Sequence, residues 1–136
     1  MPACLELSWK ALSCFAPLVD VLEILPVGKL APLPRVPVWV LGVAHHRGHL
    51  FVVNDLGYWL TGKISSPQNN LRWLWVKDEH NSVAFLIPEP KGMGECSSDN
   101  AWVWDGSQPV PDQTKQVIID FKGLLRNPSF TQVGSP

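Results

Sequence analysis

The sequence predicts an all-β protein, and three observations support this fold class. The chain of 136 residues contains 13 prolines, which limit the length of helices. It also contains 7 tryptophans, and aromatic residues suit half-buried strands. Several segments alternate apolar and polar residues with the period of two that is typical of a strand with one buried face. The length corresponds to about one domain, and a hydrophobic content of 46% is ordinary for a folded protein.

The N-terminal part of the chain is expected to supply two strands and a connector. Apolar and polar residues alternate from Leu5 to Ala11, so one strand is predicted over Leu5 to Phe15. The run VDVLEIL predicts a second strand over 19–25, which Pro26 ends. The segment LAPLPRVP, residues 30–37, has three prolines in eight residues and predicts an extended connector.

A β-hairpin is predicted in the middle of the chain, in the stretch WVLGVAHHRGHLFVVNDL. Its first strand contains Gly42, and a glycine inside a strand usually marks a bulge or a close backbone approach. Arg47, Gly48 and His49 form the expected turn, and Leu50 to Val53 form the return strand.

The rest of the chain is expected to contain short helices, a second hairpin and long loops. Asn54 or Asp55 can cap a helix that runs through Leu60 and ends at Gly62. The segments LRWLWVK and SVAFLIP, joined by residues 78–81, predict the second hairpin. Residues 89–116 are expected to be long loops around one or two short strands, with AWVW (101–104) as the strand candidate. The end of the chain predicts a strand over 117–119 and a helix that Asp120 caps and Pro128 stops.

Charge and cysteine content exclude several classes of protein. The net charge is −1 and the pI is about 6.4, so we expect no binding to nucleic acid or to an anionic membrane. No apolar run is long enough to span a bilayer, and the first residues lack the pattern of an export signal. Cys4, Cys14 and Cys96 fit neither a disulfide framework nor a zinc site. We therefore expect three reduced, buried thiols in a cytoplasmic protein.

The histidines of the central hairpin raise the question of catalysis or metal binding. On a helix, His45 and His49 would share a face and could hold a metal. In a strand, however, His45 and His46 point to opposite faces, and Arg47 beside them would repel a cation. No nucleophile elbow, phosphate-binding loop or thiol-enzyme signature is present in the sequence. We therefore expect no catalytic residues, no metal and no cofactor.

The order of several short motifs resembles the CheW-like domain of bacterial chemosensory adaptors. The resemblance is specific over residues 18–60, and the ending LLRNPSF and the short N-terminus are most similar to the PilI type of type IV pilus systems. Val52 stands where the family usually has proline, and the segment VAFLIPEP departs from the family's usual pattern. The matching motifs are Val21-Leu22-Glu23-Ile24, Leu33-Pro34, Trp39-Val40-Leu41-Gly42-Val43, Arg47-Gly48 and Val52 to Leu56.

The resemblance implies a fold, a function and partners. It implies a single domain, residues 1–136, made of two small SH3-like β-barrels (about 18–70 and 71–120) packed on a shared core, closed by the N-terminal strand and a short C-terminal helix. It implies a non-catalytic cytoplasmic adaptor that joins the cytoplasmic tip of a methyl-accepting chemoreceptor to a CheA-type histidine kinase, without nucleic acid or membrane insertion. The positions that match the family's partner contacts are Val21, Glu23, Gly42, Arg47 and Gly48. From the residues alone, core packing for Val21 and a solvated strand face for Glu23 stay equally open.

Two alternatives of other classes remain. Trp73 and Trp75 share a strand face, as do Trp102 and Trp104, and such stripes could stack carbohydrate rings. If they form the core instead, at least one of Trp102 and Trp104 should be buried between the two barrels. A small metal-dependent hydrolase that uses the histidines is the less favoured alternative.

Overall fold

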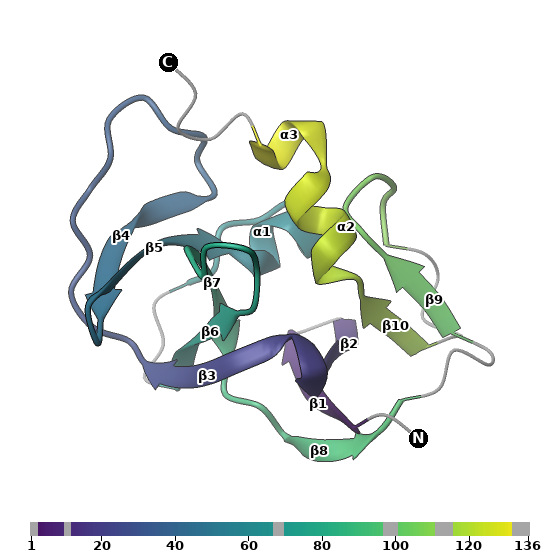
Figure 1. Ribbon diagram of the computed structural model, residues 1–136. Helices are drawn as coiled ribbons and strands as arrows, with labels where there is room; N and C mark the ends of the chain where they lie inside the picture. Colours follow the sequence, from purple (N-terminus) through teal and green to yellow (C-terminus); the bar gives the residue numbers. More distant parts are fainter. Residues whose placement is uncertain (1–2, 10–11, 67–69, 97–100, 111–115, 132–136) are drawn as a thin grey trace.

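A computed structural model describes residues 3–9, 12–66, 70–96, 101–110 and 116–131, and it confirms the predicted all-β class (Figure 1). Within these residues, ten strands form two five-stranded sheets. In sheet order, the first contains β8 (Gly92–Glu95), β1 (Ala3–Trp9), β2 (Leu12–Pro17), β10 (Gln116–Ile119) and β9 (Ala101–Trp104). The second contains β3 (Val21–Pro26), β6 (Leu71–Val76), β7 (Val83–Pro88), β5 (His49–Asp55) and β4 (Val40–His46).

The helices are short and lie at the ends of strands. A 3-10 turn, Leu18–Asp20, leads into β3, and α1 (Leu56–Thr61) follows β5. The predicted caps of α1 are confirmed: the Asp55 carboxylate accepts a hydrogen bond from the Tyr58 N–H, and Gly62 ends the helix in the left-handed conformation. The described part of the chain ends with α2 (Phe121–Arg126), capped by Asp120 as predicted, and α3 (Pro128–Thr131). Pro128 therefore ends one helix and begins another, since proline suits a first helical turn.

The N-terminal segment forms two strands, and the prediction of a single strand is wrong. β1 and β2 pair antiparallel as a hairpin, with Trp9 opposite Leu12. The buried side chains change parity along this segment, from Leu5 and Leu7 to Leu12, Cys14 and Ala16. A strand that continued straight would keep one parity, so this change is the sequence signal of the hairpin. The strand β8 is the second of the one or two short strands expected in the loop region, but its position was not predicted because its sequence, GMGE, carries no strand pattern.

The two sheets do not divide at residues 70 and 71, the expected boundary between the two barrels. The second hairpin, β6 and β7, pairs with β3 on one side and with β5 on the other. One sheet therefore takes all five of its strands from the segment between Val21 and Pro88, and the other combines the N-terminal hairpin with strands from residues 92–119. The reason is that β3 needs β6 as its hydrogen-bonded neighbour, although about fifty residues separate them along the chain.

The two sheets share a core. The larger cluster of buried side chains includes Leu7 and Ile119 from the first sheet and Leu74 and Ile87 from the second. Trp104 of β9 is also part of this cluster, with 1% of its surface exposed, which confirms that a tryptophan of AWVW is buried between the sheets. A smaller cluster lies within the second sheet and is formed by Leu25, Ala44, Phe51, Val53, Trp73, Trp75 and Ala84.

Cys4 and Cys96 form a disulfide, so the expectation of three reduced thiols is wrong for this pair. The two Cα atoms lie 5.6 Å apart because β1 and β8 are neighbours in the sheet, although 92 residues separate the cysteines in the chain. Cys14 is a free, buried thiol as expected, and its burial raises the pKa of the thiol well above the ordinary value.

Candidate functional site

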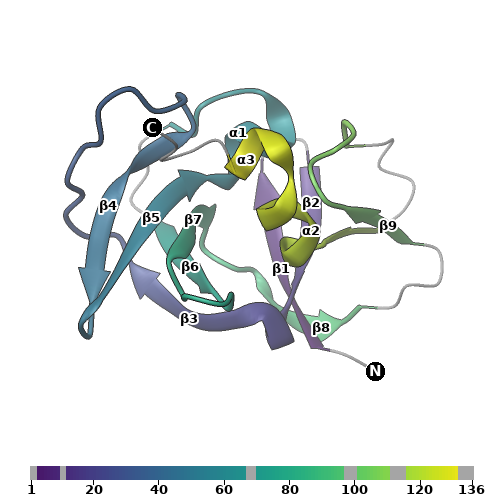
Figure 2. The ribbon, with the colours of Figure 1, turned by 45° about the horizontal axis from the view of Figure 1, so that its top comes forward.

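The predicted β4–β5 hairpin is formed, but its turn consists of Arg47 and Gly48, and His49 of the predicted turn is the first residue of β5. Both residues have positive φ, 51° for Arg47 and 81° for Gly48, the combination that a type I′ turn requires. Glycine adopts this conformation without strain, whereas arginine does so at a small cost. The tip of the hairpin lies beside β3 in both views of the ribbon (Figures 1 and 2).

A cluster of charged and polar side chains joins this tip to β3. Arg47 Nη1 donates a hydrogen bond to Glu23 Oε1 over 3.0 Å, and His46 Nε2 lies 3.7 Å from Glu23 Oε2. The Arg47 side chain is 71% exposed, and that of Glu23 is 31% exposed. β3 and β4 are the outer strands of the second sheet, so this ion pair connects two edges that no backbone pairing joins.

The hydrogen bond to Glu23 orients the Arg47 side chain and leaves other N–H donors of its guanidinium for a partner. A guanidinium has five N–H donors in one plane, and a single one of them donates to Glu23. The other donors lie on a side chain that is largely in solvent, where they can form a bidentate contact with a carboxylate. The pair therefore presents a partly oriented arginine at the apex of the hairpin.

Two of the predicted contact residues, Gly42 and Val21, have contacts inside the protein. Gly42 is buried, and a Cβ added there would lie 2.6 Å from the backbone oxygen of Ala31. The close approach that this glycine permits is therefore that of the protein's own connector, whose Ala31 pairs with Val43 through two hydrogen bonds of 2.8 Å. Partner contact at Gly42 stays a prediction. Val21 is half-buried and packs against the larger core, which is the core alternative left open by the sequence.

The other predicted contact residues come together at the hairpin tip. Glu23, Arg47 and Gly48 lie on one partly exposed surface, and a Cβ on Gly48 would meet no atom within 4 Å. Sequence reasoning missed the exposed apolar residues on the same strands, Leu22 and Ile24 of β3, each 37% exposed, and Leu50 of β5, 67% exposed. The signal for Leu22 and Ile24 was the apolar run VLEIL, on a strand that proves to be an edge of the sheet.

The histidines lie on different faces, as predicted. The His45 side chain is exposed, whereas the rings of His46 and His49 both approach the indole of Trp75, with centroid distances of 6.0 and 5.4 Å. Within the described ranges, no three His, Cys, Asp or Glu side chains are grouped so that they could hold a metal ion. None of the described helices is long and apolar enough to cross a membrane.

The tryptophan stripes do not form an exposed stacking platform. Trp73 and Trp75 are 5% and 6% exposed and pack with Phe51 inside the second sheet. Trp104 is buried, which leaves Trp102, 36% exposed, as the partly open member of the two predicted stripes. A carbohydrate ring needs an accessible aromatic face, so this geometry does not support the carbohydrate-binding alternative.

Comparisons with known proteins agree with the fold. The model of the CheW-like domain family matches residues 9–123. Protein FrzA of Myxococcus xanthus is 50% identical over 40 residues, which are 29% of this chain and 25% of FrzA. The crystal structure of the scaffolding protein TtCheW from Thermoanaerobacter tengcongensis is similar with a TM-score of 0.65 and 16% identity, over 74% of this chain and 66% of that chain. The likeness to TtCheW confirms the predicted fold of two small SH3-like barrels.

Proposed function

The chain belongs to the CheW-like domain family, and we propose that it is a non-catalytic adaptor that couples the cytoplasmic tip of a chemoreceptor to a CheA-type histidine kinase. The matched segment spans a quarter of the length of FrzA, and the matched part of TtCheW is 66% of that chain. Because the larger core draws on both sheets, we treat residues 1–136 as one adaptor domain. We place its action in the cytoplasm, where both partners present the parts that it would bind.

The observation that carries this proposal is the ion pair between Glu23 and Arg47 at the exposed end of the hairpin. An exposed pair of this kind adds little to folding, about 0–1 kcal/mol. An arginine that contributes little to stability, yet is held in one place with free donors, is suited to bind a carboxylate of a partner. Leu22 and Ile24 are exposed on the same strand, but they alternate with Glu23 and lie on the other face of β3.

We further propose that the signalling system is one that controls twitching through type IV pili. The support is the resemblance of the segment LLRNPSF to the PilI type of adaptor. Twitching and swimming systems use receptors and kinases of the same general chemistry, so the geometry of the hairpin is compatible with both kinds of system. Deletion of the gene, followed by measurement of twitching and swimming, distinguishes the two outputs.

The test of the adaptor function is the variant Arg47→Ala. We expect it to bind purified receptor or kinase fragments about 2 kcal/mol more weakly, roughly a 30-fold rise in Kd, which is the scale of a hot spot. Its free energy of unfolding should change by about 1 kcal/mol or less, because the pair with Glu23 is exposed. Isothermal titration measures the first quantity, and urea denaturation the second.

Arg35→Ala is the matched control. Arg35 is also exposed and also has a positive φ, 58°, but it lies in the connector and has no ion pair with any described residue. We expect this control to bind partners as the unmodified protein does. Normal partner binding by Arg47→Ala would remove the hairpin from the interface, and an equal loss in both arginine variants would indicate a nonspecific effect of charge.

A further inference from the structure

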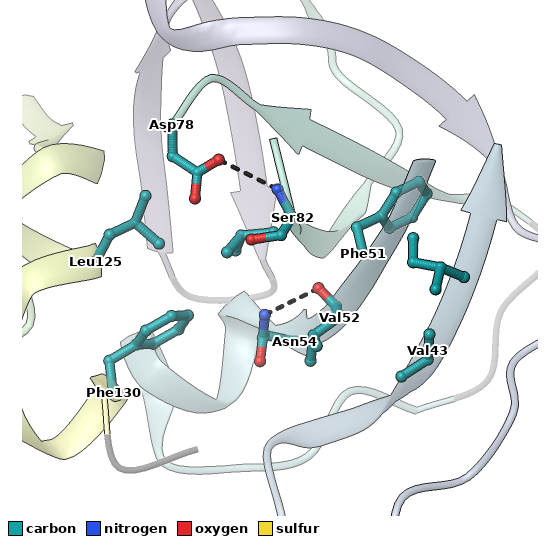
Figure 3. A pocket seen from close by; sticks show the side chains of 10 residues that line it. Val43, Phe51, Val52, Asn54, Asp78, Ser82, Leu125 and Phe130 are labelled. Carbon is teal, nitrogen blue, oxygen red and sulfur yellow. Dashed lines mark hydrogen bonds between the residues drawn. The ribbon is translucent and has the colours of Figure 1, made fainter. Parts of the chain in front are cut away.

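A pocket of about 430 Å³ lies between strand β5, the loop that follows β6, and the C-terminal helices (Figure 3). Its walls are mainly apolar and include Val52, Val83, Leu125 and Phe130. Three polar residues, Asn54, Asp78 and Ser82, interrupt this lining. The pocket therefore combines an apolar interior with a few polar groups, the usual composition of a specific binding site.

Asn54 is the unusual residue of this pocket. It is 1% exposed, and its Nδ2 donates to the carbonyl oxygens of Val52 and Ala84, each over 3.2 Å. Because both neighbours are acceptors, the amide cannot turn over without losing both bonds, so its orientation is determined. Figure 3 shows the nitrogen toward Val52 and the oxygen on the opposite side. Asn54 Oδ1 has no hydrogen-bond partner among the described residues, and such a buried acceptor requires a donor from elsewhere.

Asp78 gives the pocket its charge. Its Oδ1 accepts a hydrogen bond from the Ser82 N–H over 3.1 Å. This bond joins the two ends of the 78–81 loop and fixes the position of the carboxylate. It is the one charged residue among the described residues that line the pocket. No lysine or arginine in that lining neutralises it, so the pocket favours a cationic group that donates hydrogen bonds.

We propose that this pocket binds the guanidinium group of an arginine side chain from a bound protein. A guanidinium has only donors, which suit the Asn54 oxygen and the Asp78 carboxylate. The methylene stem of the arginine would contact the apolar walls. The pocket also includes Leu50 of the β4–β5 hairpin, which presents Arg47. The choice of a protein as the source rests on the proposed adaptor function, whereas the choice of a guanidinium does not.

The first experiment needs no partner. The full-length protein is titrated with n-butylguanidinium and with n-butylurea, a neutral analogue of nearly the same shape, and binding is followed by NMR. We expect n-butylguanidinium to bind saturably and n-butylurea to bind at least about tenfold more weakly, because the urea lacks the charge that Asp78 attracts. Equal binding of the two probes, or no saturable binding of either, would overturn the proposal.

Two variants with the same charge change sharpen this test. Asp78→Asn keeps an acceptor for the Ser82 N–H but removes the charge, and we expect it to weaken n-butylguanidinium binding about tenfold. Glu79→Gln changes the neighbouring residue, which is exposed and outside the lining, and should leave the affinity unchanged. If Asp78→Asn binds the probe as tightly as Glu79→Gln does, the pocket is not the site. Asn54→Leu, which removes the unpartnered oxygen, should likewise weaken binding if it folds.

A second experiment tests the source of the guanidinium. With a receptor or kinase fragment that the protein captures, n-butylguanidinium should compete with capture, and Glu79→Gln should be inhibited as the unmodified protein is. Probe binding without competition would overturn the assignment to a protein side chain and indicate a free guanidinium compound instead. If the chain captures no partner at all, the adaptor function fails while the probe titration still decides the chemistry of the pocket.

Discussion

Replacement of Trp104 by alanine should lower the free energy of unfolding far more than replacement of Trp102, which lies two residues earlier on the same strand. Trp104 is 1% exposed within the core that both sheets share, and its indole Nε1 donates to the Gln108 carbonyl oxygen over 2.9 Å. Trp102 is 36% exposed on β9, an outer strand of its sheet. The two positions thus offer the same side chain in two environments.

The expected magnitudes follow from this burial. Truncation of a fully buried tryptophan costs about 3–5 kcal/mol, a range that includes the cavity it leaves. The lost hydrogen bond to Gln108 contributes about 1 kcal/mol of this. Since roughly a third of Trp102 is already in solvent, its truncation should cost about 1–2 kcal/mol. The variants should therefore differ by about 2 kcal/mol, or about 8 °C in Tm for a chain of this size.

Urea denaturation followed by far-UV circular dichroism measures both costs without relying on tryptophan fluorescence. If Trp104→Ala does not fold, Trp104→Phe retains most of the buried area and should still cost more than Trp102→Phe. Equal urea midpoints for Trp102→Ala and Trp104→Ala would refute the placement of Trp104 in the shared core. They would also reopen the question of an exposed tryptophan surface.

Three further predictions concern backbone geometry, the disulfide and a cap. Gly42→Ala should destabilise the protein by about 2 kcal/mol or more, because its Cβ would lie 2.6 Å from a backbone oxygen of the connector. Gly48→Ala has open space around it and should cost about 1 kcal/mol. Thermal melts should therefore show a larger loss for Gly42→Ala than for Gly48→Ala. Reduction of the Cys4–Cys96 bond should lower stability by about 2–4 kcal/mol, and Cys4→Ser should show the same loss without responding to reductant; an unchanged melt in reductant would contradict this. Asp55→Ala removes the acceptor of three hydrogen bonds at a residue that is 1% exposed, so it should cost about 2 kcal/mol or more, and a urea midpoint equal to that of the unmodified protein would refute the cap.

Features determined by neighbouring residues could be predicted from the sequence. The Arg47-Gly48 turn, the Asp55 and Gly62 caps and the second hairpin all depend on segments a few residues long. Each has a chemical signature in place: a glycine where φ is positive, a carboxylate before a helix, alternating residues on both sides of a turn. The resemblance to the CheW-like family also rested on such short motifs, and the family comparison confirmed it.

Features that join distant residues were decided by the tertiary structure. The Cys4–Cys96 bond, the ion pair between Glu23 and Arg47, and the contact between Gly42 and the connector each join segments that only the folded chain brings together. The pocket around Asn54 likewise needs β5, the 78–81 loop and the C-terminal helices in their folded positions. Local sequence specifies the conformation of a segment and which of its faces is apolar. Which segment covers that face depends on the packing of the whole chain, and therefore on contacts that have no signature in either segment alone.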